Sequence, residues 1–213
     1  AAEAYNRINL TYDQIGDDGG WQEGRGYYGY MMHVSSQFAD VLKRLTNGKY
    51  NLFKHKKVAD HPLDFLAYLM SANFEDSGGG VAGSLTTVNK LAEETHNATA
   101  AWYRAKYYEE GTTLFDILWP RTTVKAIEPE QKSKLFKSIN WAVMRTGFDD
   151  PAAVTIICKA GYNDDPHHGH LDCGQFILSW LNVPFIRDLG RIEYDEIYFN
   201  EERWLYPHAS SEG

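Results

Sequence analysis

A short run near the C-terminal end, His168-Gly169-His170-Leu171-Asp172, gathers side chains that bind metals or transfer protons. Neutral imidazole does either, because its unperturbed pKa is about 6.5. A turn-rich stretch precedes the run and an apolar segment follows it, so we expect a loop that delivers it onto the start of a strand. Since strand side chains alternate, His168, His170 and Asp172 would share one face. The spacing fits two metal ligands, or one ligand beside one catalytic base.

A second polar segment, residues 17–30, is rich in glycine and leads into a periodic helix. Glu23, Arg25 and the nearby tyrosines could reach a ligand from this segment, and Trp21 could stack on a sugar. The alternative is a glycine-rich turn whose aromatic side chains only pack.

Composition excludes several classes of protein. Among 213 residues, 43% are hydrophobic and 23% are charged, which is ordinary for a globular protein. The net charge of −8 argues against a nucleic-acid partner but permits a locally basic groove for an acidic ligand. No stretch approaches the roughly 18 consecutive apolar residues of a membrane span, and the first residues lack the pattern of a signal peptide. Two cysteines form no disulfide framework.

Helices are expected from about residue 27 to 118. The first carries a stripe at helical spacing, made of Val34, Phe38, Val41, Leu42 and Leu45. Tyr27 would join that stripe, whereas Tyr28 points about 100° away and would be the tyrosine that the core needs least. A second helix should follow Asp60, and a third should span 84–108.

Beyond residue 119 the pattern favours strands. A charged connector, residues 128–134, separates the helices from four expected strands at 140–146, 152–159, 175–181 and 183–188, the last two joined by a tight hairpin at Asn182. Helices followed by strands predict an α+β protein, divided into a helical part at 1–130 and a β part at 131–213. The hairpin would return Asp188 toward the histidine run.

Two motifs carry a resemblance to a known family. D-G-G-W-x-E-G-x-x-Y-Y-G-Y starts at residue 18, and H-x-H-x-D-x-G-x-F starts at residue 168, followed by an apolar strand that ends in Asp-x-Gly. In this order they resemble heparinase II/III-like polysaccharide lyases. The resemblance implies the end of an (α/α) helical toroid followed by the first strands of an antiparallel β-sandwich, with the polysaccharide in the groove between them. It also implies a fragment of a longer enzyme.

The resemblance implies an acid–base pair. Tyr28 would be the catalytic tyrosine, with Tyr27 as the alternative if the alignment slips by one residue, and His168 would be the catalytic histidine. The residues expected to contact substrate are Glu23, Arg25, Trp21 and His167. The residue that neutralises the substrate carboxylate would lie outside this chain.

The resemblance also implies a metal site. His170 and Asp188 would match the family's zinc-binding histidine and aspartate, for a structural zinc ion or another divalent cation. The third ligand would come from later sequence, and His208 is a possible substitute.

The expected activity is cleavage of a 4-linked uronic-acid polysaccharide, of the glycosaminoglycan, alginate or ulvan type, by β-elimination. The resemblance implies a periplasmic or secreted enzyme. One alternative is a metal-dependent glycan hydrolase, in which His168, His170 and Asp172 hold an ion that activates water. Another is a non-catalytic carbohydrate-binding protein that stacks sugars on Trp21 and the tyrosines.

Overall fold

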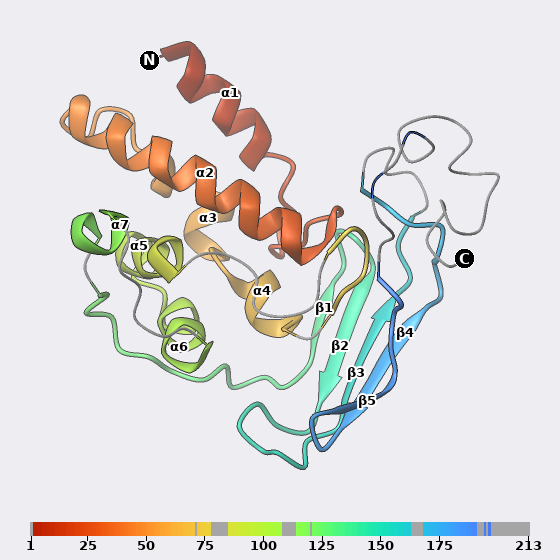
Figure 1. Ribbon diagram of the computed structural model, residues 1–213. Coiled ribbons are helices and arrows are strands. Elements are labelled where there is room, and N and C mark those ends of the chain that lie inside the picture. The colour runs from red at the N-terminus through yellow and green to blue at the C-terminus, as the bar shows by residue number, and fades with distance from the viewer. Residues whose placement is uncertain are drawn as a thin grey trace.

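A layer of helices packs against one face of a β-sheet, as Figure 1 shows. The computed structural model describes residues 2–70, 72–77, 85–107, 114–119, 121–162, 168–190, 194 and 196. The helical elements are α1 (Ala2–Tyr12), α2 (Gly24–Leu45), the 3-10 helix η1 (Leu52–Lys54), α3 (Lys56–Asp60), α4 (Asp64–Tyr68), α5 (Leu85–Thr95), α6 (Ala98–Tyr107) and α7 (Leu114–Leu118). The strands are β1 (Lys134–Phe136), β2 (Trp141–Arg145), β3 (Thr155–Lys159), β4 (Phe176–Trp180) and β5 (Val183–Ile186). The predicted α+β class is confirmed.

The longest helix, α2, buries a different face from the one predicted. Val34 and Leu45 of the predicted stripe are 50% and 80% exposed, whereas Tyr28 and Met32 are 0% exposed. The buried face continues through the small residues Ser35, Ser36 and Ala39 to Leu42. The pattern of large apolar residues does not reveal this face, because serine and alanine are too small or too polar to be recognised as part of an apolar stripe.

One further helical prediction needs correction, and one helix was not predicted. The helix predicted over 84–108 is divided into α5 and α6, with His96 in the left-handed region at φ 51° between them. Asn97 then starts α6, because its Oδ1 accepts the backbone N–H of Ala100 at 2.8 Å. The helix α1 was not predicted. None of the described helices has the length and hydropathy that crossing a membrane requires.

The five strands pair in chain order, and each pair is antiparallel. The four predicted strands are confirmed as β2 to β5, and β1 is an additional short strand. Leu181 and Asn182 form the two-residue turn between β4 and β5, with φ of 52° and 57°. Positive φ at both positions is what a tight hairpin requires, and asparagine tolerates it.

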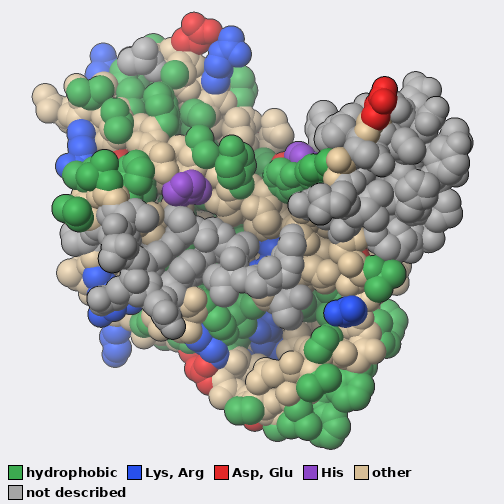
Figure 2. Space-filling view, in the orientation of Figure 1, with side chains coloured by type: hydrophobic (Ala, Val, Ile, Leu, Met, Phe, Trp, Pro, Cys, Tyr) green, Lys and Arg blue, Asp and Glu red, His purple; other side chains and the backbone are tan. Residues whose placement is uncertain are grey.

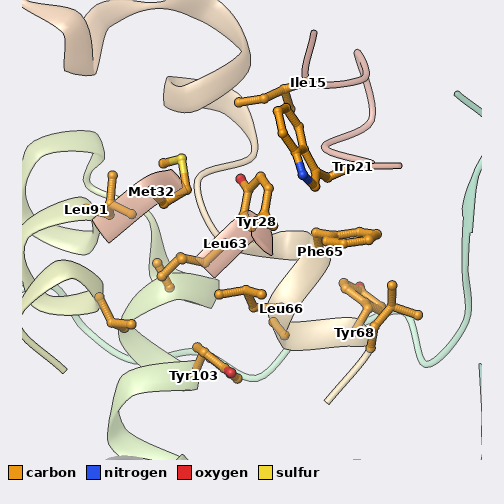
Figure 3. Close-up of a cluster of buried hydrophobic side chains, with 14 of the residues drawn as sticks. Ile15, Trp21, Tyr28, Met32, Leu63, Phe65, Leu66, Tyr68, Leu91 and Tyr103 are labelled. Atoms are coloured by element: carbon orange, nitrogen blue, oxygen red, sulfur yellow. The ribbon is translucent and has the colours of Figure 1, made fainter. Parts of the chain in front are cut away.

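The core lies where the helices meet the sheet. The ring of Phe65 on α4 packs edge-on against Phe136 of β1 at 5.2 Å between centroids, and Phe74 packs against Trp141 of β2 at 5.3 Å. Figure 3 shows the helical side of this cluster, with Tyr28, Phe65 and Tyr68 among the buried side chains. Aromatic contacts therefore join the two layers.

The other face of the sheet carries apolar side chains that are largely exposed. Phe176 and Trp180 on β4 are 41% and 46% exposed, and Phe185 on β5 is 60% exposed. Alternation along β4 turns Ile177, at 3% exposed, toward the helices instead.

Candidate functional site

The first turn of α2 packs closely against residues 72–77, the segment that follows α4. Gly24 permits this approach, because its φ is 79° and a Cβ there would lie 2.9 Å from the carbonyl oxygen of Phe74. The backbone N–H of Gly26 donates to Ser77 Oγ at 2.9 Å. The segment thereby brings Glu75 and Asp76 close to the start of α2.

His168 lies directly against the start of α2. Its Nδ1 is 2.8 Å from Glu23 Oε1, and its ring stacks on the ring of Tyr27 with 3.6 Å between centroids and 17° between planes. Glu23 is held in turn by the indole Nε1–H of Trp21, which donates to Oε2 at 3.1 Å. A carboxylate at Nδ1 fixes the proton on that nitrogen and leaves the lone pair of the neutral ring on Nε2. The side chains of His168 and Glu23 are 28% and 26% exposed, so solvent reaches the pair.

Hydrogen bonds connect Tyr27 to the second histidine of the run. The hydroxyl oxygens of Tyr27 and Tyr194 are 2.7 Å apart, and the Tyr194 hydroxyl donates to Asp76 Oδ2 at 2.9 Å. The other oxygen of Asp76 accepts from His170 Nε2 at 2.9 Å, and both of these side chains are 0% exposed. Because Tyr194 donates to Asp76, Tyr27 is the donor toward Tyr194. Partial burial, together with Tyr27 and Asp76, raises the pKa of Tyr194.

A buried cluster of charges lies next to His170. The Lys159 ammonium contacts Glu75 Oε1 and Asp172 Oδ1, and the three side chains are 1%, 3% and 8% exposed. The other oxygen of Glu75 accepts the backbone N–H of His170 at 2.5 Å. Burial raises the pKa of Glu75 to about 7, against the opposing effect of Lys159.

Three side chains form a group that could hold a cation. His170, Asp172 and Asp188 each offer a ligand atom, and these atoms all lie within 4.8 Å of one another. Asp172 Oδ2 and Asp188 Oδ2 are buried and have no hydrogen-bond partner among the described residues. Burial raises the pKa of Asp188. Nitrogen and carboxylate oxygen donors with uncompensated lone pairs fit zinc, so the residues present are compatible with the predicted ion.

The histidine run lies in a loop, as its turn-rich surroundings predict, but its three polar side chains do not share the strand face that was expected. Residues 168–174 lie in the connection from β3 to β4, and β4 begins only at Phe176. His168 turns to Glu23 and Tyr27, whereas His170 turns to Asp76. In the described part of the chain, His168 is therefore not in the group that could hold a cation, and the hydrolase set of His168, His170 and Asp172 is not assembled.

Tyr28 is not placed to touch a substrate. It is 0% exposed, and its hydroxyl donates to the carbonyl oxygen of Pro62 at 3.1 Å. Burial also raises its pKa. The prediction that the core needs Tyr28 least is wrong, because the phase of α2 turns this residue into the core, as Figure 3 shows. Tyr27, one residue earlier, stacks on His168 instead.

Arg25 and Trp21 are also buried, which contradicts the expectation that they contact substrate. Arg25 is 2% exposed, and its Nε donates to the carbonyl oxygen of Ala72 at 2.5 Å. Trp21 is 7% exposed, so its ring offers no stacking surface. Of the predicted substrate residues, Glu23 remains at the surface beside His168. His167 and His208 lie outside the described residues.

Four residues of the site were not predicted from the sequence: Glu75, Asp76, Lys159 and Tyr194. Glu75 and Asp76 come shortly before three glycines at residues 78–80, which mark a break between the predicted helices. A pair of acidic residues before such a break was the available signal. Lys159 ends an apolar strand, where a lysine is ordinarily exposed, and nothing in the sequence near Tyr194 indicates its partners.

Comparison with known proteins relates the C-terminal part of this chain to a protein family. Residues 128–211 match the family model described as Heparinase II/III-like, C-terminal. The expected resemblance to heparinase II/III-like proteins is confirmed over this stretch, which contains the second motif but not the first. No curated protein matches the sequence.

Solved structures of similar fold include heparinases. Heparan sulfate lyase HepC from Pedobacter heparinus shares 16% identity over 95% of this chain, with a TM-score of 0.68, and a mutant of it gives 0.70. A structure described as Heparinase III shares 16% identity over 89% of this chain, with a TM-score of 0.66. At this identity the likeness establishes the fold. The chain spans 30% of the length of the latter protein and 31% of the former.

Proposed function

We propose that the protein is a polysaccharide lyase that cleaves a 4-linked uronic-acid polysaccharide by β-elimination. The observation that carries this proposal is the stack of Tyr27 on His168, with Glu23 at Nδ1 of the histidine. It pairs a phenol with an imidazole of defined tautomer at a position that solvent reaches. The heparinase-like fold and the match of residues 128–211 to the family model support the assignment.

The proposed reaction needs one base and one acid. The base removes the C5 proton of the uronate, the bond from C4 to the bridging oxygen breaks, and a double bond forms between C4 and C5. The departing oxygen takes a proton, and no water is consumed. Proton transfers of this kind by positioned side chains contribute about 10²–10⁴ to the rate.

We assign the base to His168 and the acid to Tyr27. The hydrogen bond to Glu23 puts the accepting lone pair of His168 on Nε2. Tyr27 carries a phenolic proton that is shared with Tyr194, and Tyr194 is oriented by Asp76. Tyr27 thus replaces Tyr28 in this role. Because Arg25 is buried, the uronate carboxylate would be neutralised by a residue elsewhere in the protein, as the family resemblance implies.

We further propose a structural zinc ion at His170 and Asp188, with Asp172 as the nearby third donor. The ion would provide a partner for Asp172 Oδ2 and Asp188 Oδ2, which are buried and have no hydrogen-bond partner among the described residues. Asp76 accepts from His170 Nε2, which leaves Nδ1 as the ligand nitrogen. The ion would tie the histidine loop to the end of β5, and another divalent cation is the alternative occupant.

The expected context of this site follows the family. The helices would be the end of an (α/α) toroid, and the exposed face of the sheet around Phe176 and Phe185 would be covered by a second sheet of a β-sandwich. The substrate would be an acidic polysaccharide, with heparan sulfate the first to test because the similar structures include a heparan sulfate lyase. A periplasmic or secreted location would bring the enzyme to such polymers.

Ultraviolet absorbance of the unsaturated product tests the proposal in the whole protein. Heparan sulfate, chondroitin sulfate, dermatan sulfate, alginate and ulvan should be assayed in turn. Tyr27→Phe and His168→Ala are each expected to lower the turnover rate by at least about 100-fold. Tyr30→Phe is the matched control, since Tyr30 is 67% exposed on the same helix. Unchanged turnover in both Tyr27→Phe and His168→Ala would contradict the assignment.

Tyr28→Phe separates the two tyrosines. We expect near-normal turnover for this variant and a loss of about 1 kcal/mol of stability, because it removes one buried hydrogen bond. Loss of turnover in Tyr28→Phe with full activity in Tyr27→Phe would restore the original assignment.

A further inference from the structure

A cavity of about 670 Å³ lies between the helices and the sheet. Its walls come from the end of α6, from Met70 and Asn73 after α4, and from strands β2 to β5. Figure 2 shows a hollow between the helical part and the lower end of the sheet, with Lys or Arg side chains at its edge. Neither Tyr27 nor His168 lines the cavity. A volume of this size is in the range of small-molecule sites.

Arg145 is the central cation of this cavity. It extends from the end of β2, its guanidinium carbon lies 4.5 Å from the centre of the Phe148 ring, and it donates to the carbonyl oxygen of Tyr68. Its Nε is buried and has no hydrogen-bond partner among the described residues. Burial lowers the pKa of Arg145 to about 10, so it stays charged at neutral pH. A buried N–H without a partner is unfavourable, and an incoming acceptor would satisfy it.

Arg187 supplies a second guanidinium to the same cavity and is exposed. In the part of the chain that the structure describes, neither arginine has a carboxylate partner. The nearby lysines differ, because Lys106 pairs with Asp149 and Lys132 pairs with Glu128. The two arginines therefore place guanidinium groups without ion-pair partners in the described ranges in this cavity, although the net charge of the protein is −8.

The acidic residues of the cavity are already engaged. Asp150 Oδ1 accepts the N–H of Ala152 at 2.8 Å, and Asp188 Oδ1 accepts the N–H of Gly190 at 2.6 Å. Asp188 also belongs to the proposed zinc group, where a cation would neutralise it. These hydrogen bonds leave both aspartates charged, but neither carboxylate pairs with Arg145 or Arg187 among the described residues. The two guanidinium groups can therefore accept a planar or tetrahedral oxyanion as their partner.

The rest of the lining suits a sugar ring. Tyr103 and Tyr107 contribute aromatic side chains, and Asn73, Ser179 and Asn182 contribute amide and hydroxyl groups. An apolar wall with a few polar groups is typical of a site that orients a small ligand. Sugar hydroxyls could exchange hydrogen bonds with these amides while an acidic substituent contacts the arginines.

We propose that this cavity is a binding site for a sugar that carries an oxyanion, either a carboxylate or a sulfate ester, held by Arg145 and Arg187. The inference rests on the cavity alone and stands whether or not Tyr27 and His168 perform elimination. It gives the protein a second point of contact with an acidic saccharide, next to Asp188 and apart from the stacked pair.

Calorimetric titration of the protein with glucuronate, glucose 6-sulfate, glucose and inorganic sulfate tests the site. We expect at least one acidic sugar to bind tenfold or more tightly than glucose, since charge-assisted hydrogen bonds are worth at least this factor. Arg187→Ala should weaken that binding at least tenfold without affecting folding, because the residue is exposed. Arg7→Ala, on the exposed surface of α1, should bind as the parent does.

Arg145→Gln, with folding checked by thermal unfolding, should also weaken binding at least tenfold. The proposal is overturned if acidic sugars bind no better than glucose, or if both arginine variants retain the parent affinity. Inorganic sulfate that binds as tightly as glucose 6-sulfate would overturn the sugar specificity. A lyase assay on the same samples separates this site from the proposed function, because Tyr27 and His168 are unchanged in these variants.

Discussion

Tyr27 and Tyr28 are adjacent in sequence but have opposite environments. Consecutive residues of a helix point about 100° apart, so only one of the two can face the loop between β3 and β4 that carries His168. Tyr27 stacks on that histidine, and Tyr28 is enclosed by the core. The motif that starts at residue 18 contains both tyrosines, but only the rotation of the helix decides which one meets His168 and which one enters the core.

Substitution of Lys159 tests the buried charge cluster that it forms with Glu75 and Asp172. Lys159→Met is expected to lower the free energy of unfolding by about 3–5 kcal/mol, because it leaves the buried carboxylates of Glu75 and Asp172 without a cation. Urea unfolding at pH 8 measures the loss. Lys137→Met, at an exposed position of the same β part, should change stability by less than about 0.5 kcal/mol.

The double variant Lys159→Met with Glu75→Gln should recover part of the loss, since it removes one of the two uncompensated charges. A double variant as unstable as Lys159→Met, or a harmless single change, would show that the cluster is not balanced in this way.

The positions of the helices and strands were predicted better than the faces that they bury. Alternation and turn residues identified β2 to β5, and the Asn182 hairpin fixed the pairing of β4 with β5. The buried face of α2 was missed because it passes through Ser36 and Ala39, while Val34, Val41 and Leu45 lie on the exposed side. The site depends on these orientations, so the sequence indicated its residues without giving their partners.

A pair of substitutions on α2 measures its phase. Met32→Ala should cost about 2–5 kcal/mol of stability, because Met32 is 0% exposed. Val34→Ala, at a position that is 50% exposed, should stay within about 0.5 kcal/mol of the parent. Chemical denaturation of both variants gives the comparison. A larger loss for Val34→Ala would mean that the originally predicted stripe is the buried one.

The junction of helices and sheet depends on pH through Asp64. Its Oδ2 is 3.0 Å from His61 Nδ1 and 2.6 Å from the Lys134 ammonium on β1. Burial alone would raise the pKa of Asp64, but the contacts with His61 and Lys134 outweigh it and lower the pKa. A lowered pKa stabilises the fold above the unfolded value of about 3.9, and this stability is lost as the pH falls below it.

Asp64→Asn should therefore destabilise the protein by about 1–3 kcal/mol at pH 7, and by clearly less at pH 3. Urea unfolding at the two pH values tests this. Asp17→Asn is the control, since the Asp17 side chain is 98% exposed. A difference between Asp64→Asn and the parent that is equal at both pH values would contradict the electrostatic explanation.

In the whole molecule, residues far apart in sequence meet at one place. Glu23 and Tyr27 come from the start of α2, Asp76 from the segment after α4, and His168 from the loop after β3. No local pattern encodes such contacts, because they depend on how the helices pack on the sheet. The family resemblance supplied His168, His170 and Asp188, and the fold adds the residues that link them.

Removal of the proposed zinc ion should lower the stability of the fold, and activity should be lost only as a consequence. Zinc bound to His170 and Asp188 stabilises the folded state by about 2.7 kcal/mol when free zinc exceeds its dissociation constant 100-fold. We expect EDTA to lower the midpoint of thermal unfolding, and zinc to restore it. Asp188→Ala should contain less zinc by elemental analysis and should no longer respond to EDTA, whereas Asp17→Asn should behave as the parent. Loss of activity at an unchanged unfolding midpoint would instead indicate a catalytic metal, because a structural ion contributes through folding.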